Sequence, residues 1–232
     1  MLKLVKYFSS SISHLLFPEV CLLCGTKVSG KFKIICTECA VYKFESATET
    51  YEDRINMPEG VSFRVALWSF DKGGYLQEIL HKLKYHRLTA VGEDLGLFLG
   101  ARIKKIPAAK ILNKENSLIL PVPLHPRKKR MRGFNQARYI AMGVSEVLGF
   151  PLCDPKSVRR IKNTKSQTGY SLKKRRANIS KAFRMEDAEE ITGKHIIIID
   201  DVFTTGATTF ELANELKIAK PSSICIATVA QA

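Results

Sequence analysis

The chain has 232 residues, of which 45% are hydrophobic, and a formal net charge of +15. This length suits one ordinary domain with a small accessory module. No apolar run reaches the ~18 residues that a membrane-spanning helix needs, so the composition allows a packed core, excludes a membrane span and leads us to expect a cytoplasmic location.

The net charge is concentrated in one segment. Residues 121–184 contain 17 of the 37 Lys and Arg residues and only two acids, Glu146 and Asp154, so this segment accounts for the whole excess of +15. Such concentration indicates a polyanionic partner, either nucleic acid or a phosphorylated small molecule. A solvated basic face is the alternative interpretation.

The first 18 residues carry two early lysines and several apolar side chains, interrupted by Ser9–Ser11 and His14. No small-residue cleavage site follows them. This pattern predicts a short amphipathic helix that packs on the body of the protein, and it argues against a signal peptide.

Four cysteines come next, in two pairs with the spacing C-x2-C-x11-C-x2-C: Cys21, Cys24, Cys36 and Cys39. Each pair can present two thiolates to one ion, and four thiolates complete a tetrahedral zinc shell with no open position. We therefore expect a structural Zn²⁺ in a zinc-ribbon module over residues 1–42, with Lys27, Lys31 and Lys33 partly offsetting its negative charge. Disulfides are the alternative and are disfavoured in a cytosolic chain.

Residues 43–60 are polar and weakly patterned, and they predict a linker to an α/β domain over residues 61–232. Strands and helices alternate along this domain, which favours a mostly parallel sheet with right-handed crossovers. The expected strands begin at 61, 117, 195 and 222, and the expected helices cover 75–87, 93–106, 133–149 and 209–217. Residues 151–184 are basic and show little periodicity.

The stretch HIIIIDDVFTTGATT, residues 195–209, indicates a ligand site. The isoleucines predict a strand buried on both faces, and an open α/β sheet binds ligands beyond the carboxyl ends of its strands. Thr204–Thr208 lead into a helix whose first N–H groups can hold a phosphate. Asp200 and Asp201 can accept the hydroxyls of a sugar or bind a divalent cation. Together these groups suit a ribose 5-phosphate.

The same stretch resembles the phosphoribosyl pyrophosphate (PRPP) signature of the type I phosphoribosyltransferases. Three further stretches, LHKLKYHR, PVPLHPRKKRMRGFNQA and TKSQTGYSLKKRRANISKAF, follow a four-cysteine module and resemble the ComF family (competence protein F). The resemblance extends from Phe17 onward and implies a type I phosphoribosyltransferase-like fold, a mostly parallel sheet flanked by helices.

The resemblance also implies roles. Asp200 and Asp201 would bind the ribose hydroxyls, directly or through Mg²⁺, and Thr204, Thr205, Gly206, Ala207 and Thr208 would cradle the 5-phosphate. Residues 121–129 would form the pyrophosphate loop, residues 164–176 a mobile flap, and Lys84 and Arg87 further anion contacts. The basic candidates for stabilising the leaving pyrophosphate are Arg127, Lys128, Arg130, Arg132, Arg175 and Arg176.

Two functions remain open from the sequence. The first is a phosphoribosyltransferase that releases pyrophosphate and acts in natural transformation, with an unknown acceptor. The second is a non-catalytic protein that binds PRPP and single-stranded DNA and has other DNA-uptake proteins as partners. Its basic segment and aromatic residues such as Phe134, Tyr139 and Tyr170 would hold the single strand. No general base for an acceptor is obvious, and His81, His86 and His125 are interpreted as ordinary polar residues.

Overall fold

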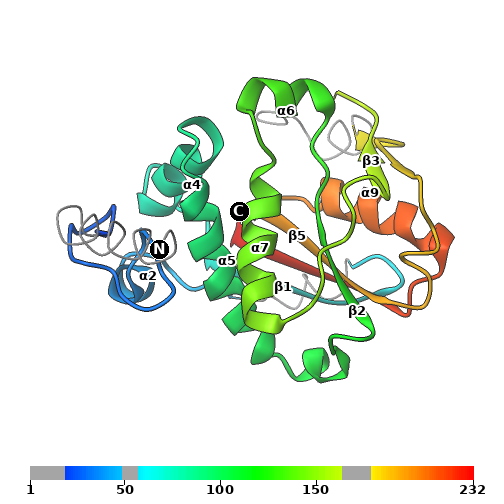
Figure 1. Cartoon of the computed structure of the whole chain (residues 1–232), viewed down its shortest axis with the longest axis horizontal. Helices are drawn as coiled ribbons and strands as arrows, with labels where there is room; N and C mark the ends of the chain where they lie inside the picture. The colour runs from blue at the N-terminus through cyan, green and yellow to red at the C-terminus, as the bar shows by residue number, and fades with distance from the viewer. Residues whose placement is uncertain (1–18, 49–56, 164–178) are drawn as a thin grey trace, which may run out of the picture.

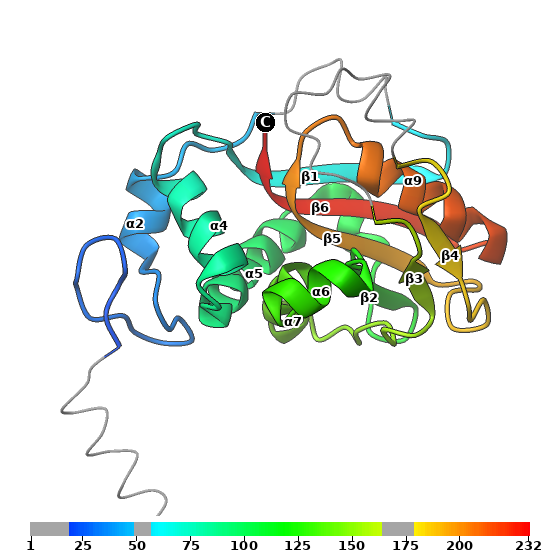
Figure 2. The ribbon, with the colours of Figure 1, turned by 90° about the horizontal axis from the view of Figure 1, so that it is seen from above.

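The computed structural model describes residues 19–48, 57–163 and 179–232, so the predicted N-terminal helix and the predicted flap lie outside the described residues. The centre of the protein is a four-stranded sheet (Figures 1 and 2). Its strands, in spatial order, are β1 (Val61–Ser69), β6 (Ser223–Gln231), β5 (His195–Phe203) and β2 (Ser117–Pro121). All three pairings are parallel, which confirms the expected mostly parallel sheet.

The isoleucine run of β5 is buried on both faces of the sheet, as predicted. Ile197 and Ile199 pack in a core with α4 (Tyr75–Tyr85), α5 (Thr89–Lys104) and α7 (Gln136–Leu148). Ile196 and Ile198 pack in a second core with α9 (Ala207–Leu216). Successive side chains of a strand point to opposite faces, so the run supplies both cores at once.

Helices α5 and α7 pack closely because glycines line their contact. A Cβ atom on Gly96 would lie 2.1 Å from the carbonyl oxygen of Ile140, and one on Gly143 would lie 2.1 Å from that of Glu93. Any larger residue would push the helices apart. This contact fixes α7 against α5. The segment that precedes the N-terminus of α7 lies next to the candidate site. Two short 3-10 helices, η1 (Pro107–Ile111) and η2 (Lys217–Ala219), also lie in the described ranges.

Two features of the basic segment were not predicted. Residues 126–132, expected as part of a loop, form a helix, α6 (Pro126–Arg132), which His125 caps by accepting the N–H of Arg127. Strands β3 (Val158–Arg160) and β4 (Phe183–Met185) form an antiparallel pair where no periodicity was seen. A seven-residue basic helix and three-residue strands are too short to show an apolar period.

The cysteine segment lies at one end of the molecule, beside α4 and α5, and opposite β3 and β4 (Figures 1 and 2). The second cysteine pair lies at the start of a helix, α2 (Thr37–Tyr42), with Cys36 as its N-cap and Cys39 in its first turn, and the chain then runs along β1. The N–H of Ala47 donates to the carbonyl of Leu67, and that of Ser69 to Glu45. Phe44 is buried. The division at residues 42 and 60 stays a prediction.

None of the helices in the described ranges is both long enough and apolar enough to cross a bilayer.

Candidate functional site

The acidic pair lies inside the last part of β5, where β2 has already ended. Pro121, the last residue of β2, pairs with Ile199, so Asp200 and Asp201 have no partner strand on that side. Their carboxylates accept hydrogen bonds from neighbouring backbone N–H groups instead. The N–H of Asp201 donates to Oδ1 of Asp200, and that of Val202 to Oδ1 of Asp201, both at 2.9 Å.

Lys84 of α4 compensates one of these two carboxylates. Its Nζ lies 2.5 Å from Oδ2 of Asp201, which is nearly inaccessible to solvent. Burial acts to raise the pKa of Asp201, but the charge of Lys84 outweighs it and holds this pKa below its ordinary value. Burial, and then the charge of Asp201, raise the pKa of Asp200 to about 8. The pair therefore consists of one compensated carboxylate and one that favours its protonated form.

Basic side chains from three further positions surround the pair. Arg132 of α6 donates to Oε1 of Gln136 at 2.9 Å, and its guanidinium lies 5.5 Å from the ring centre of Tyr85. Burial, and then the charges of Arg160 and Arg132, lower the pKa of Lys128. Burial lowers the pKa of Arg160, and the carboxylate of Asp200 partly offsets this. Several cations thus share one place, which favours a polyanionic ligand there.

Arg160 was not among the sequence candidates. It lies on β3, a strand of three residues inside the unpatterned basic segment, so neither spacing nor alternation distinguished it from its neighbour Arg159. The fold brings it to the acidic pair because β3 pairs with β4 beside the parallel sheet. Its burial would have been the only useful signal, and burial is a tertiary property.

The threonine turn has the geometry of a small anion site. Gly206 adopts a left-handed conformation, with φ of 71°, and α9 begins at the next residue, two residues before the expected start at 209. A Cβ on Gly206 would lie 2.5 Å from the ring of Phe210 and 2.8 Å from that of Phe203, so a larger residue would crowd both rings and strain the left-handed backbone. A small cavity of about 20 Å³ borders Asp200, Thr204, Gly206, Ala207 and Thr208.

The hydroxyl of Thr205 in this turn is buried and has no hydrogen-bond partner among the described residues. Buried polar groups are nearly always satisfied. The first N–H groups of α9 also lack intrahelical acceptors. Both observations leave donors available for a ligand oxygen.

The remaining basic candidates are distributed unevenly. Arg87 packs against Gly133, at the junction of α6 and α7. Arg127 and Arg130 are exposed on α6 and make no side-chain contact with the acidic pair. Lys84 pairs with Asp201, Arg132 lies near Lys84, and Lys128 lies near Arg132 and Arg160. Arg175 and Arg176 lie outside the described residues.

Of the histidines, His81 and His86 are exposed and pack ring to ring at 5.6 Å. His125 caps α6, and burial, together with nearby cations, lowers its pKa.

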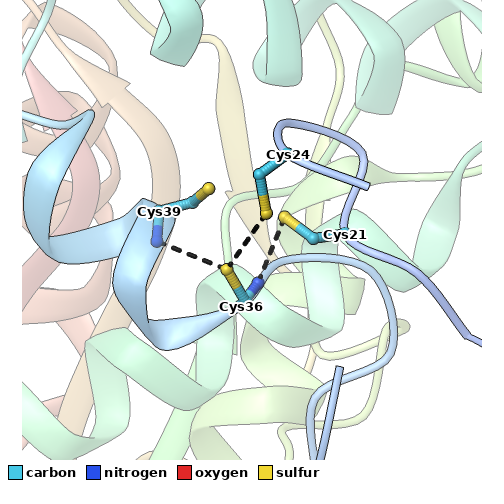
Figure 3. A group of neighbouring side chains, drawn as sticks. All are labelled: Cys21, Cys24, Cys36 and Cys39. Carbon is cyan, nitrogen blue, oxygen red and sulfur yellow. Dashed lines mark hydrogen bonds between the residues drawn. The ribbon is translucent and has the colours of Figure 1, made fainter. Parts of the chain in front are cut away.

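The four N-terminal cysteines form a compact cluster (Figure 3). Their sulfur atoms lie within 4.8 Å of one another, and those of Cys24 and Cys36 are 3.7 Å apart. Zn–S bonds of about 2.3 Å in a tetrahedron separate sulfurs by about 3.8 Å. Backbone N–H groups of Cys36 and Cys39 each point at a sulfur, at 3.4 Å. The cluster can hold a metal ion, and its geometry suits zinc.

Two of the three lysines between the cysteine pairs form ion pairs with acids of the helices. Lys33 pairs with Glu93 of α5, and Lys31 lies 3.1 Å from Glu146 of α7. Both side chains therefore attach the cysteine segment to the helices. The expected offset of the thiolate charge by Lys27, Lys31 and Lys33 stays a prediction.

Asp94 of α5 makes the tightest connection between the cysteine segment and the sheet domain. Its carboxylate is fully buried and accepts the N–H groups of Lys33, Ile34 and Ile35 at 2.8–3.1 Å. Phe32 stacks on Phe98 of the same helix, with ring centres 4.5 Å apart. These residues directly precede Cys36, so α5 shapes the loop that presents the second cysteine pair.

Comparison with known proteins bears on the same region. Residues 135–232 match the phosphoribosyl transferase domain family. The DNA utilization protein YhgH of Shigella flexneri is 32% identical over 141 residues, which are 61% of this chain and 60% of that protein. Competence protein F of Haemophilus influenzae is 36% identical over 43% of each chain. Competence protein ComFC of Bacillus subtilis is 24% identical over 82% of this chain and 68% of its own.

The matched region spans about three-fifths of YhgH. Among solved structures, the glutamine PRPP amidotransferase from B. subtilis has 16% identity and a TM-score of 0.39, over 60% of this chain and 26% of its own.

Proposed function

The chain belongs to the ComF family and carries a phosphoribosyltransferase-type domain, and from this premise we propose that it binds PRPP and transfers the 5-phosphoribosyl group to an acceptor. The observation that carries the proposal is the convergence at one sheet edge of two unlike carboxyl groups, several half-buried cations and a threonine turn with unused donors. Each of these groups matches one part of PRPP.

The three parts of the site divide the ligand between them. The turn of Thr204–Thr208 and the first N–H groups of α9 hold the 5-phosphate. Asp200 and Asp201 accept the ribose hydroxyls, which are donors. Lys128, Arg132 and Arg160 lie where the cations converge and hold the pyrophosphate. Arg127, which is exposed in the first turn of α6, stays a predicted contact of the pyrophosphate.

The reaction is a displacement at the anomeric carbon. A nucleophile of the acceptor forms a bond to C1′, the bond from C1′ to the pyrophosphate oxygen breaks, and pyrophosphate leaves with the electron pair. The proton lost by the nucleophile passes to water. Negative charge grows on the leaving group, so preorganised cations lower the barrier. In other enzymes, removing one such group costs about 100-fold or more in rate.

Asp200 and Asp201 would also fit Mg²⁺, which prefers carboxylate oxygens. The raised pKa of Asp200 reflects a carboxyl group without a compensating cation, and a divalent ion would supply one. When bound, Mg²⁺ would neutralise charge on the leaving pyrophosphate.

The cysteine cluster would hold Zn²⁺ as a structural ion. Four protein ligands would leave no open position for substrate, so its role would be to fold the segment that Asp94 fixes to α5.

Binding of single-stranded DNA is a second candidate, favoured by the net charge of +15 within residues 121–184. The names of the relatives link them to competence and DNA utilization. We propose that this chain acts in the cytoplasm, in DNA uptake with other uptake proteins. Phe134 is buried against Tyr139 in an edge-to-face pair and is not available for base stacking, and Tyr170 lies outside the described residues.

Calorimetric titration with PRPP, with and without Mg²⁺, tests the first function. Wild type should bind in the presence of Mg²⁺, and Asp200→Asn with Asp201→Asn should lose binding at least 100-fold while keeping its circular dichroism spectrum. Glu189→Gln is the control, because its exposed carboxylate makes no ion pair with another described residue. Unchanged affinity in the double variant would refute the site assignment.

Salt dependence separates the second function from the first. Binding of a fluorescent single strand should weaken steeply as salt rises, because released counterions drive it. PRPP binding should change far less over the same range. Single-strand binding that is insensitive to salt would argue against the basic segment as a DNA surface.

A further inference from the structure

A second cavity lies beside the proposed PRPP site, and neither Asp200 nor Asp201 lines it. It is a cavity of about 610 Å³ between the end of β2, α6, the first turn of α7 and β3. Pockets for small organic ligands have volumes of about 300–1,000 Å³. Its size therefore suits a mononucleotide or a comparable molecule, whereas the cavity of about 20 Å³ at the threonine turn is far smaller.

The walls of this cavity combine flat apolar surfaces with cations. Phe134 and Tyr139 meet edge to face, with ring centres 5.5 Å apart, and prolines of the β2–α6 connection lie nearby. The basic residues of the lining are Lys129, Arg138, Arg159 and Arg160, and its only acid is Asp154. Arg138 is half-buried and makes no side-chain hydrogen bond or ion pair with another described residue. Apolar flat surfaces with convergent cations suit a planar ring that carries an anionic group.

Arg160 belongs to both places. It lines the cavity, and it is close enough to Asp200 for that carboxylate to raise the pKa of its guanidinium against the effect of burial. Residues of α6 also contribute to both, since Lys129 and Gly133 line the cavity while Lys128 and Arg132 lie with the cations of the acidic pair. A molecule in the cavity would therefore lie next to a bound pyrophosphate or sugar.

We propose that this cavity binds the acceptor, and that the acceptor is a planar nitrogen heterocycle bearing a phosphate or carboxylate, of nucleotide size. The assignment rests on the proposed phosphoribosyl transfer. The ring lies against Tyr139 and the prolines of the β2–α6 connection, and Arg138 with Arg159 binds the anionic group. A ring or amino nitrogen of this molecule is the nucleophile that bonds to C1′ as pyrophosphate leaves.

The probes are the four common nucleoside 5′-monophosphates, orotate as a heterocyclic carboxylate, the free nucleosides and inorganic phosphate, each titrated by ligand-observed NMR and calorimetry. At least one monophosphate or orotate should bind wild type, and its nucleoside or phosphate part alone should bind at least tenfold more weakly. If a monophosphate binds and orotate does not, the anionic group of the acceptor is a phosphate. If orotate binds and no monophosphate does, the anionic group is a carboxylate.

Arg138→Gln and Arg159→Gln should each weaken this binding at least tenfold and leave PRPP affinity within twofold. Arg102→Gln, an exposed substitution on α5, is the matched control and should change neither. Two partly or fully exposed positions are used so that a failure of one variant to fold does not remove the test.

The Asp200→Asn with Asp201→Asn variant should show the reverse pattern, with PRPP binding lost and probe binding kept. If no probe binds wild type, or if neither cavity variant weakens the binding, the acceptor assignment is wrong even when PRPP binds. If PRPP fails to bind wild type, the proposed function fails instead, and the acceptor assignment falls with it.

Discussion

The cysteine cluster and the acidic pair both gather groups that repel one another when ionised, but they are compensated by different means. At the acidic pair the protein supplies its own cations, with Lys84 2.5 Å from Asp201. At the cysteines, Lys31 and Lys33 form ion pairs with Glu146 and Glu93. The groups that hydrogen-bond with the sulfurs are the backbone N–H groups of Cys36 and Cys39 and the hydroxyl of Thr26.

This difference predicts what each region needs in order to fold. Burial raises the pKa of Cys36 and of Cys39, so these thiols resist ionisation unless a cation joins them. The cysteine cluster should therefore depend on a metal ion for its structure, because metal affinity becomes folding free energy when the ligands are not otherwise held. The region around the acidic pair should fold without any ligand, and it should need a ligand only for its function.

The largest expected effect is the loss of metal from the cysteine cluster. Chelation, or Cys36→Ser, should remove on the order of 10 kcal/mol of apparent binding free energy. The amide hydrogens of the segment around Cys36 and Cys39 should then exchange rapidly in hydrogen–deuterium exchange, with loss of one equivalent of zinc by elemental analysis.

Cys225→Ala is the control for this experiment. It removes a buried cysteine of β6 outside the cluster and should keep the zinc. Native exchange rates in a metal-free wild-type protein would contradict the dependence on metal.

The next effect is the loss of the internal cation at the acidic pair. Lys84→Met leaves Asp201 buried and uncompensated, which should lower the free energy of unfolding by about 3 kcal/mol in urea denaturation. The control is Lys82→Met on the same helix, which breaks an exposed i,i+4 pair with Glu78 and should cost about 0.5 kcal/mol or less. Equal losses from both variants would show that Asp201 does not depend on Lys84.

A smaller effect is expected at the connection between the two regions. Asp94→Asn replaces an acceptor of three N–H groups by an amide with a single acceptor oxygen, which should cost about 2 kcal/mol. The amide hydrogens of Lys33, Ile34 and Ile35 should exchange faster while zinc stays bound. Glu93→Gln, one residue earlier, removes only the partly exposed pair with Lys33 and should leave these rates nearly unchanged.

The smallest effect is stabilising and depends on pH. The pKa of Asp200 is raised to about 8 in the folded protein, so its contribution to stability is fully present below pH 4 and is lost as pH rises through 8. Asp200→Asn should therefore gain stability over wild type as pH rises, by about 1 kcal/mol or a few degrees of melting temperature at pH 9.

Asp201→Asn is the matched comparison at the adjacent position. The pKa of Asp201 is lowered in the folded protein, so its contribution is present above pH 4 and is lost in acid. This variant should lose stability at neutral pH. Melting curves from pH 5 to 9 measure both signs, and the same sign for both variants would contradict the assignment of Lys84 to one carboxylate.

The main elements were predictable because their patterns are long. Four consecutive isoleucines predicted the central strand, and helical spacing of Leu76, Ile79, Leu80 and Leu83 predicted α4, whose inward face they form. The short elements were not predictable. Helix α6 and strands β3 and β4 lie in a segment rich in Lys and Arg, where no apolar period marks a buried face.

The sequence by itself determined the order of the elements, the fourfold cysteine pattern and the position of the acidic pair before a threonine turn. These depend on local chemistry, namely side-chain periodicity, ligand spacing and turn composition. Only the tertiary structure decided which basic residues share a site, that Arg160 joins them and that Lys31 and Lys33 pair with acids of α7 and α5. Those pairings join residues far apart in the chain, and burial sets their strength, so no local pattern contains them.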